Sequence, residues 1–490
     1  MAVLVWFRND LRIHDHQPLW EAVQSGRRMV PCYCFDPRQF GQTTFDFAKT
    51  GAFRAQFLLE SVADLRQSLQ SLGGDLVVRM GRPEVEIPAL VRDLGVETVF
   101  WHEEVTAEEI AVASALEAKL ATLGVKTEVY WGATLYHPDN LPFEVDRVPE
   151  VFTQFRKQVE QRSTVDDPLP TPTKLPPLPS VNPGPMPTLA DLGLAAPPLD
   201  SRGVLPFQGG ETAGLERLQD YVWTADCLKV YKETRNGMVG ANYSSKFSPW
   251  LALGCLSPRQ IYATVQCYER DRVKNDSTYW LVFELLWRDY FRFIAAKHGD
   301  CLFYPSGLRG LQIAWKQDWE RFQAWRTGMT GFPLVDANMR ELAATGFMSN
   351  RGRQNVGSFL TKNLGIDWRM GAEWFESQLI DYDVCSNYGN WNYTAGVGND
   401  ARGFRYFNIP KQSKDYDPNG TYIKHWLPEL QHLPAAKVHE PWKLQPVEQR
   451  RFGVQLGGNY PRPVVDLAQS AQANERIYNT AQPRPRRPRP

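Results

Sequence analysis

The sequence predicts two structural parts, a doubly wound α/β domain with a parallel sheet followed by an all-α domain. In the first 133 residues, short apolar runs alternate with stretches of helical periodicity, the pattern of a parallel sheet covered by helices. From about residue 207 the apolar residues follow helical spacing, with little strand alternation. A chain of 490 residues is also too long for a single core, so division into domains is expected.

Five apolar runs in the first part are predicted to be buried parallel strands, with three helices between them. The strands cover Val3–Phe7, Met29–Phe35, Leu76–Met80, Val99–Trp101 and Glu128–Trp131, and the helices cover Phe53–Leu72, Glu84–Leu94 and Thr106–Leu123. This region contains neither a G-x-G-x-x-G fingerprint nor a Walker A loop. The pattern therefore gives no support to nicotinamide binding or nucleotide hydrolysis.

A proline-rich connector, residues 134–206, is predicted to separate the two domains. Eleven prolines lie between Asp167 and Asp200, with few large apolar residues, as is typical of an extended segment without its own core. The helical domain is predicted to cover residues 207–470. Residues 471–490 are predicted to be a disordered Arg/Pro tail, and the last eight residues fit either a solvated tail or a weak contact with nucleic acid.

Composition argues against several classes of protein. The formal net charge is zero, so any DNA contact has to come from a local basic patch. The seven cysteines include no C-x-x-C pair, which argues against a disulfide framework and a zinc site, and no metal is predicted. No apolar run is long enough to cross a membrane, and charged residues interrupt the apolar start too early for a secretion signal. We expect a soluble, cytoplasmic, monomeric protein.

The segment Asp381–Tyr393 combines two carboxylates, an amide and an indole with further aromatic residues, a mixture unsuited to a simple core. The carboxylates of Asp381 and Asp383 and the amide of Asn387 can hold the edge of a polar heterocycle through hydrogen bonds. The indole of Trp391 can pack on the face of such a ring or give up an electron. The segment predicts a pocket for a redox-active, light-absorbing cofactor.

Tryptophan is concentrated in the second half of the chain, where twelve of the sixteen lie beyond residue 200. For any single tryptophan, filling a helical core is the simpler explanation. The regional excess is better explained by a cofactor site.

Two predicted helices carry further polar groups that could line a ligand site. Glu284, Trp287 and Arg288 share one helix face at i, i+3 and i+4, which fits either a ligand-lined face or an internal Glu–Arg pair beside a core tryptophan. In the motif Ser-Asn-Arg-Gly-Arg-Gln, the same spacing groups three side chains that could meet a cofactor: Asn350, Arg353 and Gln354. Arg351 points elsewhere and could meet a phosphate; the alternative is a capped helix start with solvated arginines.

A hydroxyl-rich turn follows Tyr231 and Arg235 and enters a helix at Pro249. The turn consists of Ser244, Ser245, Lys246, Phe247 and Ser248. Hydroxyls, backbone N–H groups and the positive end of a helix dipole suit a pyrophosphate, although serine-rich turns are also ordinary helix caps.

Together these motifs resemble those of the DNA photolyase and cryptochrome family, and most closely its cryptochrome DASH group. The resemblance covers nearly the whole chain and rests on Trp6–Arg12, Phe347–Arg351, Asp367–Arg369, Gln378–Asp383, Asn387–Trp391 and Trp426–Leu430. It implies a U-shaped FAD deep in the helical domain, and commonly a second, antenna chromophore near the α/β domain.

The resemblance implies roles for individual residues. Positions that match FAD contacts are Tyr231, Ser244, Ser245, Lys246, Phe247, Ser248, Arg288, Asn350, Arg353, Asp381, Asp383 and Asn387. Asn387 matches the position facing flavin N5 and is grouped as catalytic with Glu284 and Trp287, which match residues that hold a flipped pyrimidine dimer. Electrons are implied to reach the excited flavin through three matching indoles: Trp391, Trp368 and Trp315.

The implied DNA contacts are Arg235, Arg351 and Arg405 near the backbone, with Gln354 and Tyr393 in the lesion pocket. Duplex-repairing photolyases usually have methionine and tryptophan at the last two positions, so this pocket is more polar and offers less stacking surface. Flipping a dimer out of a duplex costs a few kcal/mol, and each stacked base returns about 1–3 kcal/mol. We therefore expect a preference for dimers in single-stranded DNA.

The antenna chromophore implied for this group is a folate, 5,10-methenyltetrahydrofolate. Glu104 lies at the end of a predicted strand, where a pterin contact could fall. A solvated acid beside Glu103 explains this residue equally well.

The expected function is repair of cyclobutane pyrimidine dimers in single-stranded DNA, with the electron supplied by light-excited reduced FAD. The alternative is a photosensory, DNA-binding cryptochrome that signals or regulates transcription with little repair. A third reading, a light-independent flavin oxidoreductase, would need a substrate channel and a hydride acceptor that the sequence does not reveal.

Overall fold

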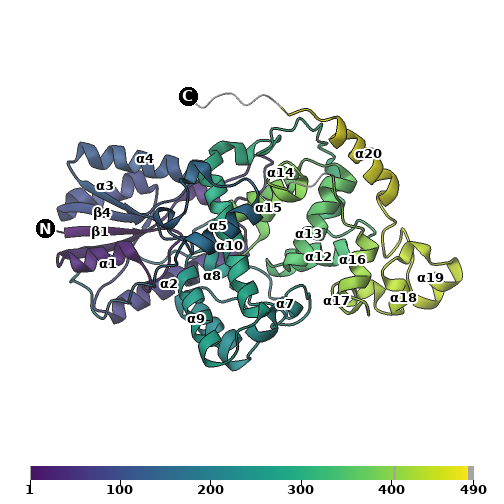
Figure 1. Cartoon of the computed structure of the whole chain (residues 1–490), viewed down its shortest axis with the longest axis horizontal. Coiled ribbons are helices and arrows are strands. Elements are labelled where there is room, and N and C mark those ends of the chain that lie inside the picture. The colour runs from purple at the N-terminus through teal and green to yellow at the C-terminus, as the bar shows by residue number, and fades with distance from the viewer. Residues whose placement is uncertain (1, 401–403, 484–490) are drawn as a thin grey trace.

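The chain folds into an α/β part at one end and a larger helical part at the other (Figure 1). The computed structural model describes residues 2–400 and 404–483. The predicted fold class, a parallel-sheet α/β domain followed by a helical domain, is confirmed. Within the described ranges, no helix is both long and apolar enough to span a bilayer.

A five-stranded parallel sheet with the strand order β3-β2-β1-β4-β5 forms the first part. Its strands are Ala2–Phe7 (β1), Arg28–Phe35 (β2), Val77–Met80 (β3), Val96–His102 (β4) and Lys126–Tyr130 (β5). Its helices are Gln17–Gln24 (α1), Ala52–Ser71 (α2), Pro83–Leu94 (α3) and Ala107–Thr122 (α4). The predicted strands and helices are all found; α1, a short helix, is the element that the sequence analysis missed.

Strand β1 divides its side chains between two cores, because successive strand residues point to opposite faces of the sheet. Leu4 and Trp6 pack with residues of α3 and α4. Val3 and Val5 face the other way, into a core that includes α1 and α2 and continues into the helical part. One face of the sheet thus joins the two parts.

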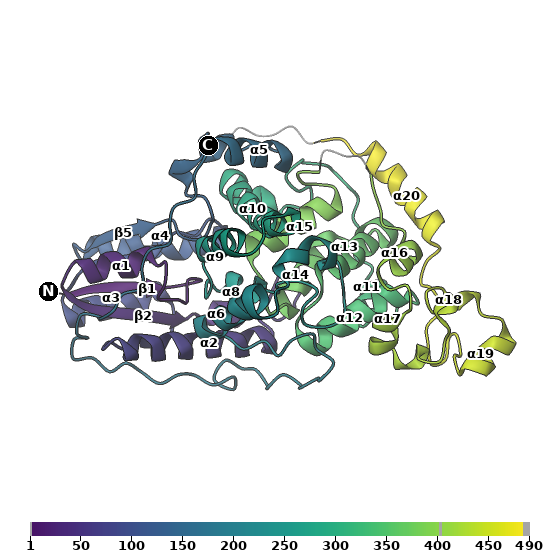
Figure 2. The same cartoon turned by 60° about the horizontal axis from the view of Figure 1, so that its bottom comes forward.

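The second part is built from helices joined by loops and short helical turns (Figure 2). These helices are Glu211–Gln219 (α6), Tyr231–Thr234 (α7), Ser248–Ala252 (α8), Pro258–Asp271 (α9), Asp276–His298 (α10), Trp319–Arg326 (α11), Pro333–Thr345 (α12), Asn350–Ser358 (α13), Trp368–Gln378 (α14), Val384–Ala395 (α15), Ile409–Tyr416 (α16), Thr421–Trp426 (α17), Ala435–Val438 (α18), Pro446–Phe452 (α19) and Leu467–Thr480 (α20). The long helix α10 starts at Asn275, whose side chain accepts hydrogen bonds from the Ser277 and Thr278 N–H groups.

The connector has more structure than its composition predicts. Residues 134–206 contain helix α5 (Phe152–Arg162). The proline-rich segment after α5 passes α2, where the Leu175 N–H donates to the Leu72 carbonyl at 2.9 Å (Figure 2). Arg66 of α2 also donates to the Gly184 carbonyl at 2.9 Å. A segment without its own core is therefore held by hydrogen bonds to a neighbouring helix.

Helix α20 replaces part of the predicted disordered tail, so that prediction is wrong for residues 471–480. Asp466 caps the helix by accepting a hydrogen bond from the Gln469 N–H, and Ala471 and Asn474 are buried. These two features outweigh the polar composition that suggested disorder. Residues 484–490 of the Arg/Pro tail lie outside the described residues.

Buried ion pairs and hydrogen bonds join the two parts of the molecule. Arg12, just after β1, is 2% exposed and donates to the Gly254 carbonyl at 2.8 Å. Asp15 pairs with Arg259 of α9 at 2.6 Å. Because these charged groups are buried away from water, each needs its partner in the other part, and the contacts fix the relative position of the two parts.

Asp289 of α10 makes a second connection, to the chain just after β5. Its carboxylate accepts hydrogen bonds from the Leu135 and Tyr136 N–H groups at 2.9 and 3.0 Å. Burial raises the pKa of Asp289 to about 7, although these two N–H groups act to lower it. The carboxyl group thus holds the connector against α10 at a cost in desolvation.

We predict that Asp289→Ala destabilises the folded protein, because it leaves the Leu135 and Tyr136 N–H groups buried without an acceptor. Each such group costs about 1–3 kcal/mol. Asp289→Asn keeps one accepting oxygen and should lose less. Urea unfolding followed by circular dichroism compares the variants, and an alanine variant as stable as the parent would contradict the prediction.

Candidate cofactor and nucleic-acid site

A cavity of about 880 Å³ opens among helices α7, α8, α10, α13, α14 and α15. This volume lies in the range of sites for large organic ligands. The predicted site residues that line it are Tyr231, Arg235, Ser244, Ser245, Lys246, Phe247, Ser248, Glu284, Trp287, Arg288, Asn350, Arg353, Gln354, Asp381, Asp383, Asn387, Trp391, Tyr393 and Arg405. The structure thus gathers residues that are far apart in the sequence, while their individual roles stay predictions.

Asp381 presents an unsatisfied acceptor in the wall of this cavity. Its Oδ2 accepts from Arg353 Nη2 at 2.8 Å. Its Oδ1 is buried, and no hydrogen-bond partner for it lies within the described residues. A buried carboxylate oxygen left in this way costs free energy. Asp381 is therefore suited to accept a hydrogen bond from a ligand N–H group.

Asp383 and Asn387 are placed by the first turn of α15. Asp383 caps this helix by accepting from the Ser386 N–H at 2.7 Å. One turn later, Asn387 donates from Nδ2 to the Ala372 carbonyl of α14 at 3.0 Å. The amide is thereby oriented before any ligand binds, as precise positioning of a cofactor requires.

The hydroxyl-rich turn at 244–248 is held by Arg217 of α6, a residue that the sequence analysis missed. Its guanidinium donates to the carbonyls of Ala241, Ser244 and Ser245 at 3.1, 3.3 and 3.1 Å. Arg217 also pairs with Asp220 at 3.0 Å, but its contacts with the turn are to backbone atoms of another segment, so no local motif marks them.

Lys246 carries a buried amine into the cavity wall. Its backbone has a left-handed φ of 56°, its side chain is nearly inaccessible, and its Nζ lies 3.3 Å from the centroid of the Tyr243 ring. Burial, followed by the nearby Arg217 charge, lowers its pKa to about 7. An anionic ligand would offset both effects, so this turn fits a phosphate group.

On the polar face of α10, Glu284 and Arg288 do not form the internal ion pair that the sequence analysis considered. Glu284 pairs with Arg235, which comes from the segment after α7. Arg288 donates to the carbonyls of Ala133 and Leu251, the latter at 3.1 Å. Glu284 and Arg288 thus have separate partners, and Arg288 supports the cavity wall as well as lining it.

The indole of Trp287 is packed on one face by Phe152 of the connector helix α5, another residue that the sequence analysis missed. The two rings stack with centroids 3.7 Å apart and an interplanar angle of 11°. Tyr393 approaches Trp287 edge-on, at 5.9 Å and 82°. Trp287, Tyr393 and Gln354 line the same cavity.

Arg351 lies outside the cavity wall, on a different face of α13 from Asn350 and Arg353, as the helical spacing predicted. It donates to Asn236 Oδ1 at 3.0 Å, and its guanidinium lies over the Tyr416 ring at 4.4 Å. Arg405 lines the cavity and pairs with Asp400 at 2.6 Å.

The three predicted electron-transfer indoles lead outward from the cavity. Trp391 is in the wall, Trp368 is fully buried, and Trp315 is half-buried. Trp368 and Trp315 both donate Nε1 to the Pro305 carbonyl, at 3.1 and 2.9 Å. Gly371 lies one helical turn after Trp368, and a Cβ there would come within 2.2 Å of the Trp391 ring, so the glycine makes room for that indole.

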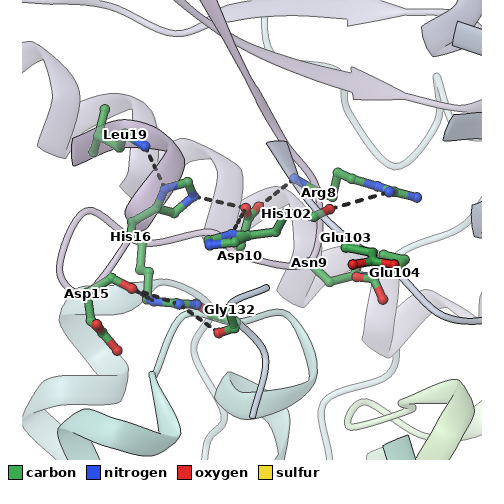
Figure 3. Close-up of polar contacts among 12 residues, drawn as sticks. Arg8, Asn9, Asp10, Asp15, His16, Leu19, His102, Glu103, Glu104 and Gly132 are labelled. Carbon is green, nitrogen blue, oxygen red and sulfur yellow. Dashed lines mark hydrogen bonds and ion pairs between the residues drawn. The ribbon is translucent and has the colours of Figure 1, made fainter. Parts of the chain in front are cut away.

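Glu104 lies away from the cavity, at the carboxyl end of β4 (Figure 3). Its Oε2 pairs with Arg292 of α10 at 2.7 Å, and its Oε1 accepts from Asn9 Nδ2 at 3.3 Å. The cavity beside it measures about 10 Å³, roughly the space for one water. Glu104 is therefore a buried ion-pair residue rather than a solvated acid, and its contact with a pterin stays a prediction.

A buried group beside Glu104 was not predicted, although it lies where strands β1 and β4 end, the point at which the strand order reverses (Figure 3). Asp10 Oδ2 lies 2.6 Å from His102 Nδ1 and 2.9 Å from His16 Nε2. Burial would raise the pKa of Asp10, but the two imidazoles hold it well below its usual value. Burial lowers the pKa of His102 to about 4.

The composition of this group is that of a metal site, since its ligand-type atoms all lie within 4.8 Å of one another. The distances from Asp10 to the imidazoles are hydrogen-bond lengths, which fits a carboxylate shared by two rings. The expected absence of a metal therefore stays a prediction.

Family models for known proteins match both parts of the chain. Residues 3–176 match the DNA photolyase family, and residues 280–480 match the FAD binding domain of DNA photolyase. The FAD-binding match includes α10, α13, α14 and α15, which form much of the cavity wall. The helical part is thus an FAD-binding domain.

Individual relatives are similar to this chain over almost its full length. Cryptochrome DASH of Gloeobacter violaceus is 70% identical over 98% of this chain and 96% of its own. The crystal structure of Synechocystis cryptochrome is 58% identical and superposes with a TM-score of 0.95, covering 97% of this chain and 99% of the other. A class III photolyase from Agrobacterium tumefaciens is 31% identical with a TM-score of 0.86, covering 98% and 97%.

These matches extend over both the sheet and the cavity. The chain belongs to the cryptochrome DASH group of the DNA photolyase and cryptochrome family.

Proposed function

We propose that the protein repairs cyclobutane pyrimidine dimers, preferentially in single-stranded DNA, under blue light absorbed by FAD in the 880 Å³ cavity. The observation that carries the proposal is that one cavity contains both sets of groups. Asp381 and Lys246 suit a flavin nucleotide, while Glu284 and Trp287 suit a flipped pyrimidine dimer. A lesion in this cavity would lie beside the cofactor.

The residues present fit FAD at its flavin ring and at its pyrophosphate. The buried Oδ1 of Asp381 has room for a hydrogen bond from the edge of a flavin ring. Lys246 and the serines of the same turn offer charge and hydroxyl donors to the pyrophosphate. When bound and reduced, FAD supplies the electron that opens the dimer after it absorbs light.

The lesion-binding roles fall to α10 and its neighbours. Glu284 can accept hydrogen bonds from a base edge, and the free side of Trp287 can stack on a base while Phe152 supports the other face. Arg235, Arg351 and Arg405 can bind phosphates of the strand. Arg235 is paired with Glu284 without DNA, so a contact of Arg235 with a phosphate competes with that pair.

The preference for single strands follows from the pocket wall. Tyr393 and Gln354 offer less stacking surface than the tryptophan and methionine usual in duplex-repairing enzymes. Releasing the dimer from a duplex costs a few kcal/mol. A pocket with less stacking surface offsets little of that free energy. A dimer in a flexible single strand avoids most of that cost.

Blue-light repair should be readily measurable on a thymine dimer in a single-stranded oligonucleotide and much weaker on the matched duplex. The protein is loaded with FAD, reduced chemically, and compared with a dark control. Liquid chromatography of the products measures restored thymines. Equal repair of both substrates would remove the proposed preference.

Tyr393→Trp should increase duplex repair by enlarging the stacking surface opposite Trp287. A gain of about 1 kcal/mol in stacking corresponds to a rise of several-fold in duplex affinity. Tyr393→Phe, which removes only the hydroxyl, is the control for ring size. If duplex repair does not improve with tryptophan, stacking surface is not what limits it.

FAD affinity should fall as pH rises above about 7, because free Lys246 has a pKa of about 7 and a bound pyrophosphate raises it. Binding then takes up a proton, so the dissociation constant increases by up to about tenfold per pH unit until the pKa of the bound form is reached. Lys246→Met should bind more weakly near pH 6 and show a flatter profile. Fluorescence quenching of added FAD measures both, and a flat profile in the parent protein would count against this role.

One observation favours the photosensory alternative. Phe152 already covers one face of Trp287, and the Arg235–Glu284 pair occupies groups that a lesion needs. Absence of repair in both oligonucleotides, with FAD bound and reducible by light, would select a sensor that uses the same cofactor.

A further inference from the structure

The rings that contact Trp391 in the described part of the chain include an indole outside the three predicted ones. Phe375 lies 5.1 Å from Trp391 between ring centroids, and Trp325 lies 6.4 Å away at 71°. Trp325, on α11, is fully buried and donates Nε1 to the Val356 carbonyl at 3.0 Å. An electron that leaves Trp391 can thus be replaced from a second direction.

The aromatic contacts continue from Trp325 to the surface along α11. Phe322 lies 5.5 Å from Trp325 and 5.8 Å from Trp319 between centroids. Trp319 is 47% exposed. The six residue steps from Trp319 to Trp325 correspond to about 9 Å of helix. Phe322, which resists oxidation, fills the space between two oxidisable indoles.

A nearby branch to Trp374 is less suited to carry a positive charge. Trp374 contacts Phe47 at 5.4 Å, and Phe47 stacks on Phe322 at 5.6 Å. The Arg326 guanidinium, however, lies 5.0 Å from the Trp374 ring centroid. A fixed positive charge so close raises the energy of an indole radical cation by Coulomb repulsion. Trp319 instead stands between two acidic neighbours in the sequence, Asp318 and Glu320.

We propose that Trp325 and Trp319 form a second route by which electrons reach the cavity, parallel to Trp368 and Trp315. Trp391 gives one electron to the light-excited cofactor and takes one from Trp325, which takes one from Trp319. A thiol in solution then returns one electron to Trp319 and loses a proton to water. No bond in the protein breaks, and the net change is transfer of one electron from the thiol to the cofactor.

This inference rests on the proposed function only in that FAD must occupy the cavity and be reduced there by light. The test uses the full chain loaded with oxidised FAD and illuminated with a thiol reductant. The variants are Trp368→Phe, Trp325→Phe, the double variant, and Trp391→Phe, which blocks both routes. Trp368→Phe combined with Trp374→Phe is the matched control, because Trp374 lies on the disfavoured branch.

Absorbance should show that Trp368→Phe still reduces its FAD under light. Adding Trp325→Phe to this variant should lower the rate of FAD reduction to that of Trp391→Phe. Adding Trp374→Phe instead should leave the rate of FAD reduction unchanged. The inference is overturned if Trp368→Phe alone is as slow as Trp391→Phe, or if Trp325→Phe adds no further loss. Trp325→Phe removes the indole donor to the Val356 carbonyl. If that double variant loses FAD, the surface change Trp319→Phe serves in its place.

A second readout follows the indoles themselves. After illumination of Trp368→Phe without thiol, peptide mass mapping should find oxidation at Trp319, and its absence there would overturn the route. Repair by chemically reduced protein needs neither route. Intact repair with failed photoreduction in Trp368→Phe therefore refutes only this inference, whereas failed repair by the reduced parent protein refutes the proposed function.

Discussion

The position of helix α10 is the constraint on which both the fold and the cavity depend. On one side, Asp289 binds the Leu135 and Tyr136 N–H groups, and Arg292 pairs with Glu104 at the end of β4. On another side, Glu284 and Trp287 face the cavity. Rotation or sliding of α10 would leave buried charges without partners, which costs several kcal/mol. The sheet therefore determines where Glu284 and Trp287 lie.

The cavity and its surroundings contain charged groups whose hydrogen-bond partners or counter-charges are incomplete within the described protein. Asp381 keeps one buried oxygen without a partner in the described chain, and burial brings the pKa of Lys246 to about 7. Farther back, burial raises the pKa of Glu341 to about 8, although Tyr422 donates to it at 2.5 Å. Such groups are costly in an empty protein and become favourable when a ligand supplies the missing charge or donor. This is the electrostatic signature of a cofactor site in a chain whose net charge is zero.

The sequence was sufficient to predict the sheet and many polar residues of the cavity wall, because apolar runs mark buried strands and these polar residues lie in short motifs. It could not reveal Arg217 or Asp289, since each binds backbone groups from a distant segment. Phe152 escaped notice because it lies in a connector that composition marks as extended, and its partner Trp287 is in another part of the chain. Composition also concealed α20, whose start depends on one capping residue, Asp466. The sequence could not show that Glu104 is ion-paired, because its partner Arg292 is 188 positions away.

The Arg235–Glu284 pair has a consequence for selectivity. With no DNA present, each charge neutralises the other, so neither a free nucleobase nor a bare phosphate gains a full ionic contact without first breaking the pair. In the proposed function, a damaged strand presents both partners at once, its backbone to the arginine and its base edge to the carboxylate. Free bases and inorganic phosphate, which each offer only one of these groups, would then be poor competitors for the site.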